Sequence, residues 1–90
     1  MKLTHKVLGE FDVNAEPTHG NIVTFYEELR AAEYADHSVP YYDGWVVKAA
    51  ITANILKTAV DVDNAKPALI NWLARELEKH VNAQREIPKN

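Results

Sequence analysis

Residues 44–60 read Gly44-Trp-Val-Val-Lys-Ala-Ala-Ile-Thr-Ala-Asn-Ile-Leu-Lys-Thr-Ala-Val60, and this segment predicts a helix with two apolar faces. At about 100° per residue, one face gathers Trp45, Val46, Ala49, Ala53, Leu56 and Val60. The opposite face is a ridge with the spacing i, i+4, i+8, which consists of Val47, Ile51 and Ile55. A helix that is apolar around most of its circumference is normally buried on both sides. We therefore expect this helix at the centre of the fold.

The ridge formed by Val47, Ile51 and Ile55 has a functional consequence, because a chain of 90 residues has little protein with which to cover it. Full burial of one such side chain contributes about 1.5–3 kcal/mol. Leaving all three in water would forgo a free energy comparable with the stability of a small domain. Two interpretations stay open. Either other parts of the chain cover the ridge, or a second protein does, through a partner groove or self-association.

The segments before this helix predict a β element and another helix. Residues 1–20 suit a strand or short hairpin followed by a loop, because apolar and polar side chains alternate in their first part, with Gly9 as a bend or bulge. Residues 21–36 have the apolar spacing of a helix, with Asn21 as its cap. The composition of residues 22–26 also suits a strand. Helix and strand therefore both stay open for this start.

The C-terminal third contains the clearest helical pattern, over residues 65–85, where leucines recur on one side. Residues 61–64 offer a cap for this helix, and Pro67 fits its first turn. His80 lies on the same apolar side. Three interpretations of His80 stay open: a hydrogen-bonded core residue, the end of the buried zone, or part of a contact surface.

Length and composition support one folded domain. Of the 90 residues, 47% are hydrophobic and 26% are charged, a balance that is ordinary for a globular protein. We therefore predict a single α+β domain over residues 1–90 that is mostly helical. It consists of an N-terminal β-strand or hairpin followed by three α-helices, over residues 21–36, 44–60 and 65–85.

Several classes of partner are not expected. The net charge is −3, and residues 1–45 carry eight acidic and three basic side chains, whereas residues 46–90 carry five and seven. No basic stripe indicates nucleic acid. The absence of cysteine removes disulfides and thiolate metal sites and suits a reducing cytoplasm. Because no signal-peptide core and no apolar run of ~18 residues occurs, we expect a cytoplasmic protein without a membrane partner.

Catalytic, cofactor and metal signatures are missing as well. The four histidines lack metal-ligand spacing, and the segment from Asp61 fails as a calcium loop because its sixth and twelfth positions are Lys66 and Trp72. The single serine, Ser38, has no nucleophile signature around it, and the three glycines form no phosphate loop. We therefore expect no enzyme, no catalytic residue, no cofactor and no metal.

Aromatic residues supply further candidate positions for an interface. Tyr41, Tyr42 and Trp45 cluster at the start of the central helix, where such residues either anchor an interface or cover the core, and both remain open. Trp72 lies at the edge of the apolar side of the last helix, where we expect it to be half exposed. The candidate protein interface consists of Val47, Ile51, Ile55, Tyr41, Tyr42, Trp45 and Trp72.

The C-terminal third resembles the ends of small proteins encoded by tailed bacteriophages, through Pro67-Ala-Leu-Ile-Asn-Trp-Leu-Ala-Arg-Glu-Leu-Glu-Lys-His-Val81 and the later Ile87-Pro88. The shared feature is a Pro-x-Leu-x-x-Trp-Leu helix start with Ile-Pro just past the helix end. Some of these proteins are similar to tail assembly chaperones. The resemblance implies a non-enzymatic role, in which the chain keeps a tape-measure or tail-tube protein soluble until the tail polymerises.

We therefore expect a non-enzymatic protein–protein interaction protein, a phage or prophage tail assembly factor in the host cytoplasm, with a protein partner, a homo-oligomer or both. The alternative is a small acidic regulatory or inhibitory protein that binds a host protein through its acidic first half. Ionic strength separates the two, because docking driven by charge weakens with salt, whereas binding through an apolar ridge barely changes.

Overall fold

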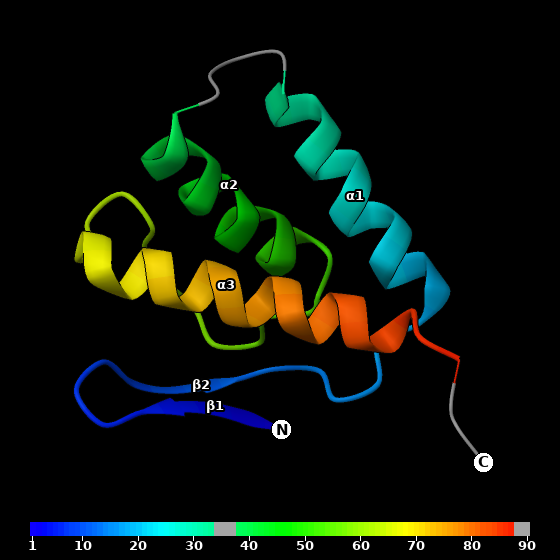
Figure 1. Ribbon diagram of the computed structural model, residues 1–90, viewed down its shortest axis with the longest axis horizontal. Coiled ribbons are helices and arrows are strands. Elements are labelled where there is room, and N and C mark those ends of the chain that lie inside the picture. The colour runs from blue at the N-terminus through cyan, green and yellow to red at the C-terminus, as the bar shows by residue number, and fades with distance from the viewer. Residues whose placement is uncertain (34–37, 88–90) are drawn as a thin grey trace.

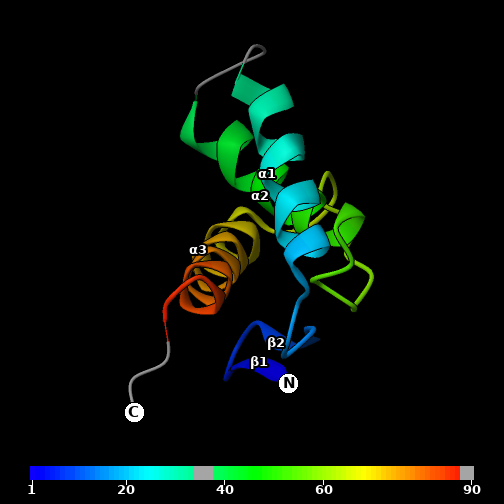
Figure 2. The ribbon, with the colours of Figure 1, turned by 90° about the vertical axis from the view of Figure 1, so that its right-hand side faces the viewer.

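The computed structural model describes residues 1–33 and 38–87, in which two strands precede three helices (Figure 1). The elements are β1 (Lys2–His5), β2 (Gly9–Asp12), α1 (His19–Glu33), α2 (Val39–Thr52) and α3 (Pro67–Gln84). Helices α1 and α2 lie together above α3, and the hairpin of β1 and β2 runs below it. The view turned by 90° keeps this order (Figure 2). The predicted α+β fold, with an N-terminal β element and three helices, is confirmed.

Strands β1 and β2 form an antiparallel hairpin, in which Leu3 lies opposite Phe11 and His5 lies opposite Gly9. Leu3 and Phe11 are both buried, so the alternation of the sequence places one face of the hairpin on the core. Gly9 has a φ of 109°, in the left-handed region that favours glycine. The Nδ1 atom of His5 accepts the backbone N–H of Val7 at 3.0 Å and helps to close the turn.

The start of α1 is helical, since residues 22–26 lie inside this helix. Its capping residue is Thr18 and not Asn21 as predicted. The Oγ1 atom of Thr18 accepts the backbone N–H of Asn21 at 3.2 Å, and Oδ1 of Asn21 accepts the backbone N–H of Thr18 at 2.8 Å. This reciprocal pair is a capping box. Residues 34–36 of the predicted helix lie outside the described residues.

Helix α2 departs most from the prediction, because it spans Val39–Thr52 and not residues 44–60. Pro40 stands in its first turn, where the missing N–H of proline costs no helical hydrogen bond. At the other end, Asn54 adopts a φ of 60°, and its N–H donates to the carbonyl of Ile51 at 3.1 Å. Asparagine tolerates this left-handed conformation, which ends an α-helix.

The residues that follow α2 are extended and pair with the end of β2. The backbone N–H of Asn14 donates to the carbonyl of Ile55 at 2.8 Å, and Val13 and Leu56 form an antiparallel bridge. The backbone N–H groups of Lys57 and Thr58 donate to the carbonyl of Asp12, in place of the i→i−4 bonds that a longer helix would make. The prediction of a helix up to residue 60 is wrong for this reason.

The predicted apolar ridge is therefore interrupted. Val47 and Ile55 are fully buried, whereas Ile51 is 37% exposed. Val47 lies on α2, which packs against both α1 and α3, and Ile55 lies in the extended segment. The interpretation in which the chain covers its own ridge holds for Val47 and Ile55, so the two are not part of an exposed face.

Helix α3 buries its apolar side against α2 and has Pro67 in its first turn, as predicted, but it spans Pro67–Gln84 and not residues 65–85. The predicted cap in residues 61–64 is wrong, because Lys66 occupies the capping position and makes no side-chain cap. Asn64 instead donates its backbone N–H to the carbonyl of Asp61 at 3.3 Å, in a separate turn. None of the helices in the described part of the chain is long and apolar enough to cross a bilayer.

His80 is a hydrogen-bonded core residue, the first of its three interpretations. It is 7% exposed, and its Nε2 lies 2.7 Å from the backbone oxygen of Asn14. Because that oxygen can only accept, Nε2 carries the proton and donates it. The bond ties α3 to the loop after β2.

Candidate functional site

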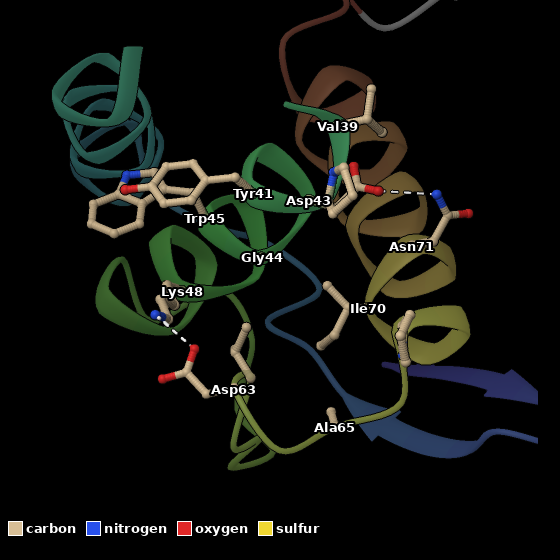
Figure 3. A pocket seen from close by; sticks show the side chains of 13 residues that line it. Val39, Tyr41, Asp43, Gly44, Trp45, Lys48, Asp63, Ala65, Ile70 and Asn71 are labelled. Carbon is tan, nitrogen blue, oxygen red and sulfur yellow. Dashed lines mark hydrogen bonds and ion pairs between the residues drawn. The ribbon is translucent and has the colours of Figure 1, made fainter. Parts of the chain in front are cut away.

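The surface of the domain is hollowed beside α2. One hollow, of about 430 Å³, lies between the first half of α2, the connection from α2 to α3, and the start of α3 (Figure 3). A second, of about 440 Å³, lies between the second half of α2, the same connection and Glu28 of α1. Both are lined by Trp45, Lys48, Val62 and Asp63, so they adjoin each other. We call the two hollows together the α2 groove.

An aromatic pair forms one wall of the α2 groove. The rings of Tyr41 and Trp45 stack with an interplanar angle of 8° and 6.0 Å between centroids, as their i, i+4 spacing on α2 allows. The indole Nε1 of Trp45 donates to the backbone carbonyl of Glu28 at 2.6 Å. This bond fixes the indole against α1, so the wall is rigid. The Nζ atom of Lys48 lies 5.8 Å from the centroid of the Trp45 ring.

Apolar side chains continue the groove on both sides of this wall. Val39 is 63% exposed at one end and Ile51 is 37% exposed at the other, while Ile70 of α3 is nearly buried at the base. The absence of a side chain on Gly44 lets the connection approach α2 closely, because an added Cβ would lie 3.3 Å from Cγ1 of Val62. The groove therefore offers an apolar surface that the domain itself leaves uncovered.

A buried carboxylate stands opposite the aromatic wall. Asp43 of α2 is only 8% exposed, and its Oδ2 accepts a hydrogen bond of 2.9 Å from Nδ2 of Asn71 on α3. Figure 3 shows the carboxylate of Asp43 pointing toward Asn71 on one side of α2, while the rings of Tyr41 and Trp45 lie on the other side of this helix. Burial of a carboxylate is costly unless charges or hydrogen bonds compensate it. The compensation given by Asn71 is that of a neutral amide.

The negative charge at this position acts on a second carboxyl group. The pKa of Glu78 on α3 is raised above its ordinary value of 4.5, first by partial burial and second by the charge of Asp43, while Arg75 opposes the shift. Within the described chain, no Lys, Arg or His side chain forms an ion pair with Asp43. The negative potential at the Asp43 end of the groove is therefore only partly balanced.

Acidic side chains outnumber basic ones along the whole α2 groove. Its described lining contains the four carboxylates of Asp43, Asp63, Asp61 and Glu28, against the one ammonium group of Lys48. Lys48 already pairs with Asp63, with 3.3 Å between Nζ and Oδ1. Both side chains of this pair are exposed, so it contributes little to stability. The groove combines apolar walls with a net negative charge.

The structure brings together three of the residues predicted for an interface. Tyr41, Trp45 and Ile51 all line the α2 groove. Tyr42, on another side of α2, is 38% exposed and lines neither hollow. Trp72 lies elsewhere, half-buried between α3 and the hairpin, where its ring packs against His5 and Phe11 with centroid distances of 5.2 and 6.0 Å. Val47 and Ile55 are inside the core.

Asp43, Lys48 and Asp63 line the site but were not predicted from the sequence. The sequence contains one indication that Asp43 is buried. It is a charged residue at helical spacing from Val39 and Val47, on the same side of the helix. A charge in such a stripe is either excluded from the core or held there by a partner. No comparable signal marked Asp63, because its place beside Lys48 depends on the course of the connection.

A third hollow, of about 650 Å³, runs along α1 beside the C-terminal end of α3. Its aromatic residue, Tyr26, already has a cationic partner, because the guanidinium of Arg85 lies 5.3 Å from the ring centroid of Tyr26 and donates to its hydroxyl at 3.1 Å. It has the larger volume but lacks both a stacked aromatic pair and a buried charge. We therefore take the α2 groove as the candidate site.

Metal-binding clusters are not found in the part of the chain that the structure describes: no three His, Asp or Glu side chains there are placed to hold an ion. His37, one of the four histidines of the sequence, lies outside the described residues.

Comparison with known proteins finds no match to this chain among protein-family models, curated proteins or solved structures. The α2 groove is therefore the structural feature on which a proposal about function depends.

Proposed function

We propose that this chain is a non-enzymatic protein-binding module whose α2 groove holds an apolar segment of a partner protein. The observation that carries the proposal is the stack of Tyr41 on Trp45, fixed against α1 by the bond to Glu28. Rigid aromatic side chains that are only half covered are typical anchors of protein interfaces, because little conformational entropy is lost when they bind.

The exposed aliphatic residues at both ends of the wall extend this surface. Val39 and Ile51 lie at the two ends of the groove, so a bound segment would run along α2 and cover both. Each aliphatic side chain removed from water on binding contributes to affinity in proportion to its apolar area. The domain buries Val47 and Ile55 without help, and the partner's contribution is confined to the groove.

The occupant is a different protein and not a second copy of the chain. A symmetric dimer brings the same patch of both subunits together. Pairing through the α2 groove would place the acidic groups of the two copies, among them Asp43 and Asp63, close to one another. Like charges at an interface cost binding free energy and select against that pairing.

Within this class, the phage resemblance of residues 67–88 makes a tail assembly factor the first identity to test. The partner would be a tape-measure or tail-tube protein, held soluble in the host cytoplasm before the tail forms. The rival is an acidic regulatory protein that docks by charge. Affinity measured from about 0.05 to about 0.5 M NaCl separates them, since exposed charge pairs are screened over this range and apolar contacts are not.

A photo-crosslinking experiment tests the groove. We place p-benzoylphenylalanine at Ile51 in one variant and at Val7 in a control variant, and irradiate cells that make the partner. Val7 is 84% exposed in the hairpin turn, on the far side of α3 from α2 (Figure 1). We expect an adduct with a second protein from position 51 and none from position 7. Equal adducts from both positions, no adduct from position 51, or an adduct of two copies of the chain would each overturn the proposal.

A further inference from the structure

The third hollow, which lies along α1 beside the C-terminal end of α3, has the opposite charge from the α2 groove. Its lining contains the guanidinium groups of Arg30 and Arg85 against the single carboxylate of Glu27, with His19 counted as neutral. The whole chain carries a net charge of −3, so this excess of positive charge is a local feature. We call this hollow, of about 650 Å³, the α1 hollow.

Tyr26 orients the guanidinium of Arg85, at the place where α3 ends beside α1 (Figure 1). The Nη1 atom of Arg85 donates to the hydroxyl of Tyr26 at 3.1 Å, and Cζ lies 5.3 Å from the centroid of the ring. The hydroxyl in turn donates to Oδ1 of Asn82 at 3.4 Å. These partners are uncharged, so they position the guanidinium without neutralising it.

The positive charge of the α1 hollow is not paired within the described chain. No carboxylate there forms an ion pair with Arg30 or Arg85, although Glu27 lies less than one helical turn from Arg30. A guanidinium has five N–H donors, and the bond to Tyr26 uses one of those of Arg85. The others remain for an anion.

Apolar side chains of α1 line the same hollow. Val23 is 39% exposed and Tyr26 is 37% exposed, while Ile22 is partly buried against the core. Val23, Tyr26 and Arg30 have the spacing i, i+3, i+7, which places them on one face of the helix. A segment that lies along α1 would therefore cover apolar side chains and reach a guanidinium group.

We propose that the α1 hollow is a second protein-binding surface, whose occupant is a partner segment with one glutamate or aspartate beside apolar side chains. The carboxylate pairs with Arg85, and its apolar neighbours lie on Val23 and Tyr26. An arginine suits this role because its guanidinium binds a carboxylate through two parallel hydrogen bonds. The inference stands on different residues from the proposed function and does not depend on it.

The balance of charge favours a carboxylate over a phosphate group. Two arginines against one glutamate leave one positive charge in excess, which matches a single negative charge. A phosphate group carries about −1.5 to −2 at pH 7 and would also face Glu27. An acidic segment is repelled by the carboxylates of the α2 groove, so the two surfaces select segments of different chemistry.

The test is an NMR titration of the whole chain with capped tripeptides. The first probe is acetyl-Leu-Glu-Leu-amide, and the matched probe acetyl-Leu-Gln-Leu-amide has nearly the same shape without the charge. We expect the glutamate peptide to shift the backbone amide of Arg85 and the methyl groups of Val23, and to bind at least about fivefold more tightly than the glutamine peptide. Equal affinities of the two peptides would overturn the inference.

Two further probes examine the rest of the occupant. Acetyl-Gly-Glu-Gly-amide should bind at least about threefold more weakly than the leucine version, because it covers less of Val23 and Tyr26. Inorganic phosphate should shift the same resonances less than the glutamate peptide does at equal concentration. Equal shifts from phosphate would indicate a general anion site and overturn the proposal of a protein partner.

Two arginine variants locate the contact. Arg85→Gln should weaken binding of the glutamate peptide at least about fivefold, since the oriented guanidinium is lost. Arg75→Gln makes the same change at an exposed position on the same helix, outside the α1 hollow, and should alter binding less than about twofold. Equal effects would contradict the assignment to Arg85. The wild-type comparison of the glutamate and glutamine peptides decides the matter even if Arg85→Gln folds poorly.

The remaining occupant is a second copy of the chain, whose α2 groove is acidic. Resonances of Arg85 and Val23 that shift with protein concentration, before any peptide is added, would assign the α1 hollow to that copy and overturn the inference. The result is separable from that of the proposed function, because crosslinking from Ile51 reports on the α2 groove and these resonances report on the α1 hollow.

Discussion

The indole of Trp45 donates a 2.6 Å hydrogen bond to the backbone carbonyl of Glu28, and this bond joins the candidate site to the scaffold. Trp45 lies on α2 and Glu28 on α1, so the bond crosses the contact between the two helices. The same ring carries the stack with Tyr41 on its other side. One side chain therefore serves both the packing of the domain and the wall of the α2 groove.

Trp45→Phe should lower the free energy of unfolding by about 1 kcal/mol, because it removes the hydrogen bond from the indole to the carbonyl of Glu28. The aromatic face toward Tyr41 would remain. Urea denaturation followed by circular dichroism measures the change. An unchanged unfolding midpoint would show that the bond contributes nothing in solution.

Ile51→Glu and Ile55→Glu should differ widely in how much they destabilise the fold. Ile51 is 37% exposed, so a carboxylate there reaches water, and we expect stability to change by no more than about 0.5 kcal/mol. Ile55 is fully buried, and an unpaired carboxylate in its place should cost more than about 4 kcal/mol and unfold the domain. Thermal melts compare the two. Similar melting temperatures would contradict the distinction between surface and core.

Asn54→Ala should destabilise the domain by about 1–2 kcal/mol, because alanine is strained at the φ of 60° that ends α2. Asn54→Gly, the matched control, should be tolerated, since glycine adopts this conformation readily. Chemical denaturation of both variants provides the measurement. If alanine were as well tolerated as glycine, the end of α2 would have to lie elsewhere.

Glu78 should make stability depend on pH in a defined direction. Its pKa is raised in the folded state by burial and by the charge of Asp43, so folding favours the neutral carboxyl. The contribution of Glu78 to stability is full below the ordinary pKa of 4.5 and is lost as the pH rises through the higher folded value. Glu78→Gln should therefore be more stable than the wild type at pH 7 and equal to it below 4.5. A variant less stable at pH 7 would reverse the sign.

Much of the fold follows from periodicity in the sequence. The alternation of residues 1–13 predicts a strand or a hairpin, and the recurrence of leucines predicts α3 nearly to its last residue. The end of α2 could not be predicted in this way. Ile55 and Leu56 suit both a helical stripe and an extended segment, and the choice depends on hydrogen bonds with Val13 and Asn14, more than forty residues earlier in the chain.

The candidate site was predictable only in its apolar part. Aromatic and aliphatic composition identified Tyr41, Trp45 and Ile51, since such residues mark either a core or an interface wherever they occur. The role of Asp43 depends on its burial against Asn71, which is set by the way α2 crosses α3. Contacts between elements that are distant in sequence leave no local pattern, so charge at the site emerged only from the structure.

The affinity of the partner for Ile51→Glu and Val7→Glu tests the α2 groove most directly, once photo-crosslinking has identified that partner. Both changes replace an exposed aliphatic side chain with the same charge, one in the groove and one in the hairpin turn. Binding through the groove predicts a loss of at least about tenfold for Ile51→Glu, and less than about twofold for Val7→Glu. Equal losses, or a larger loss for Val7→Glu, would contradict the assignment of the groove as the binding site.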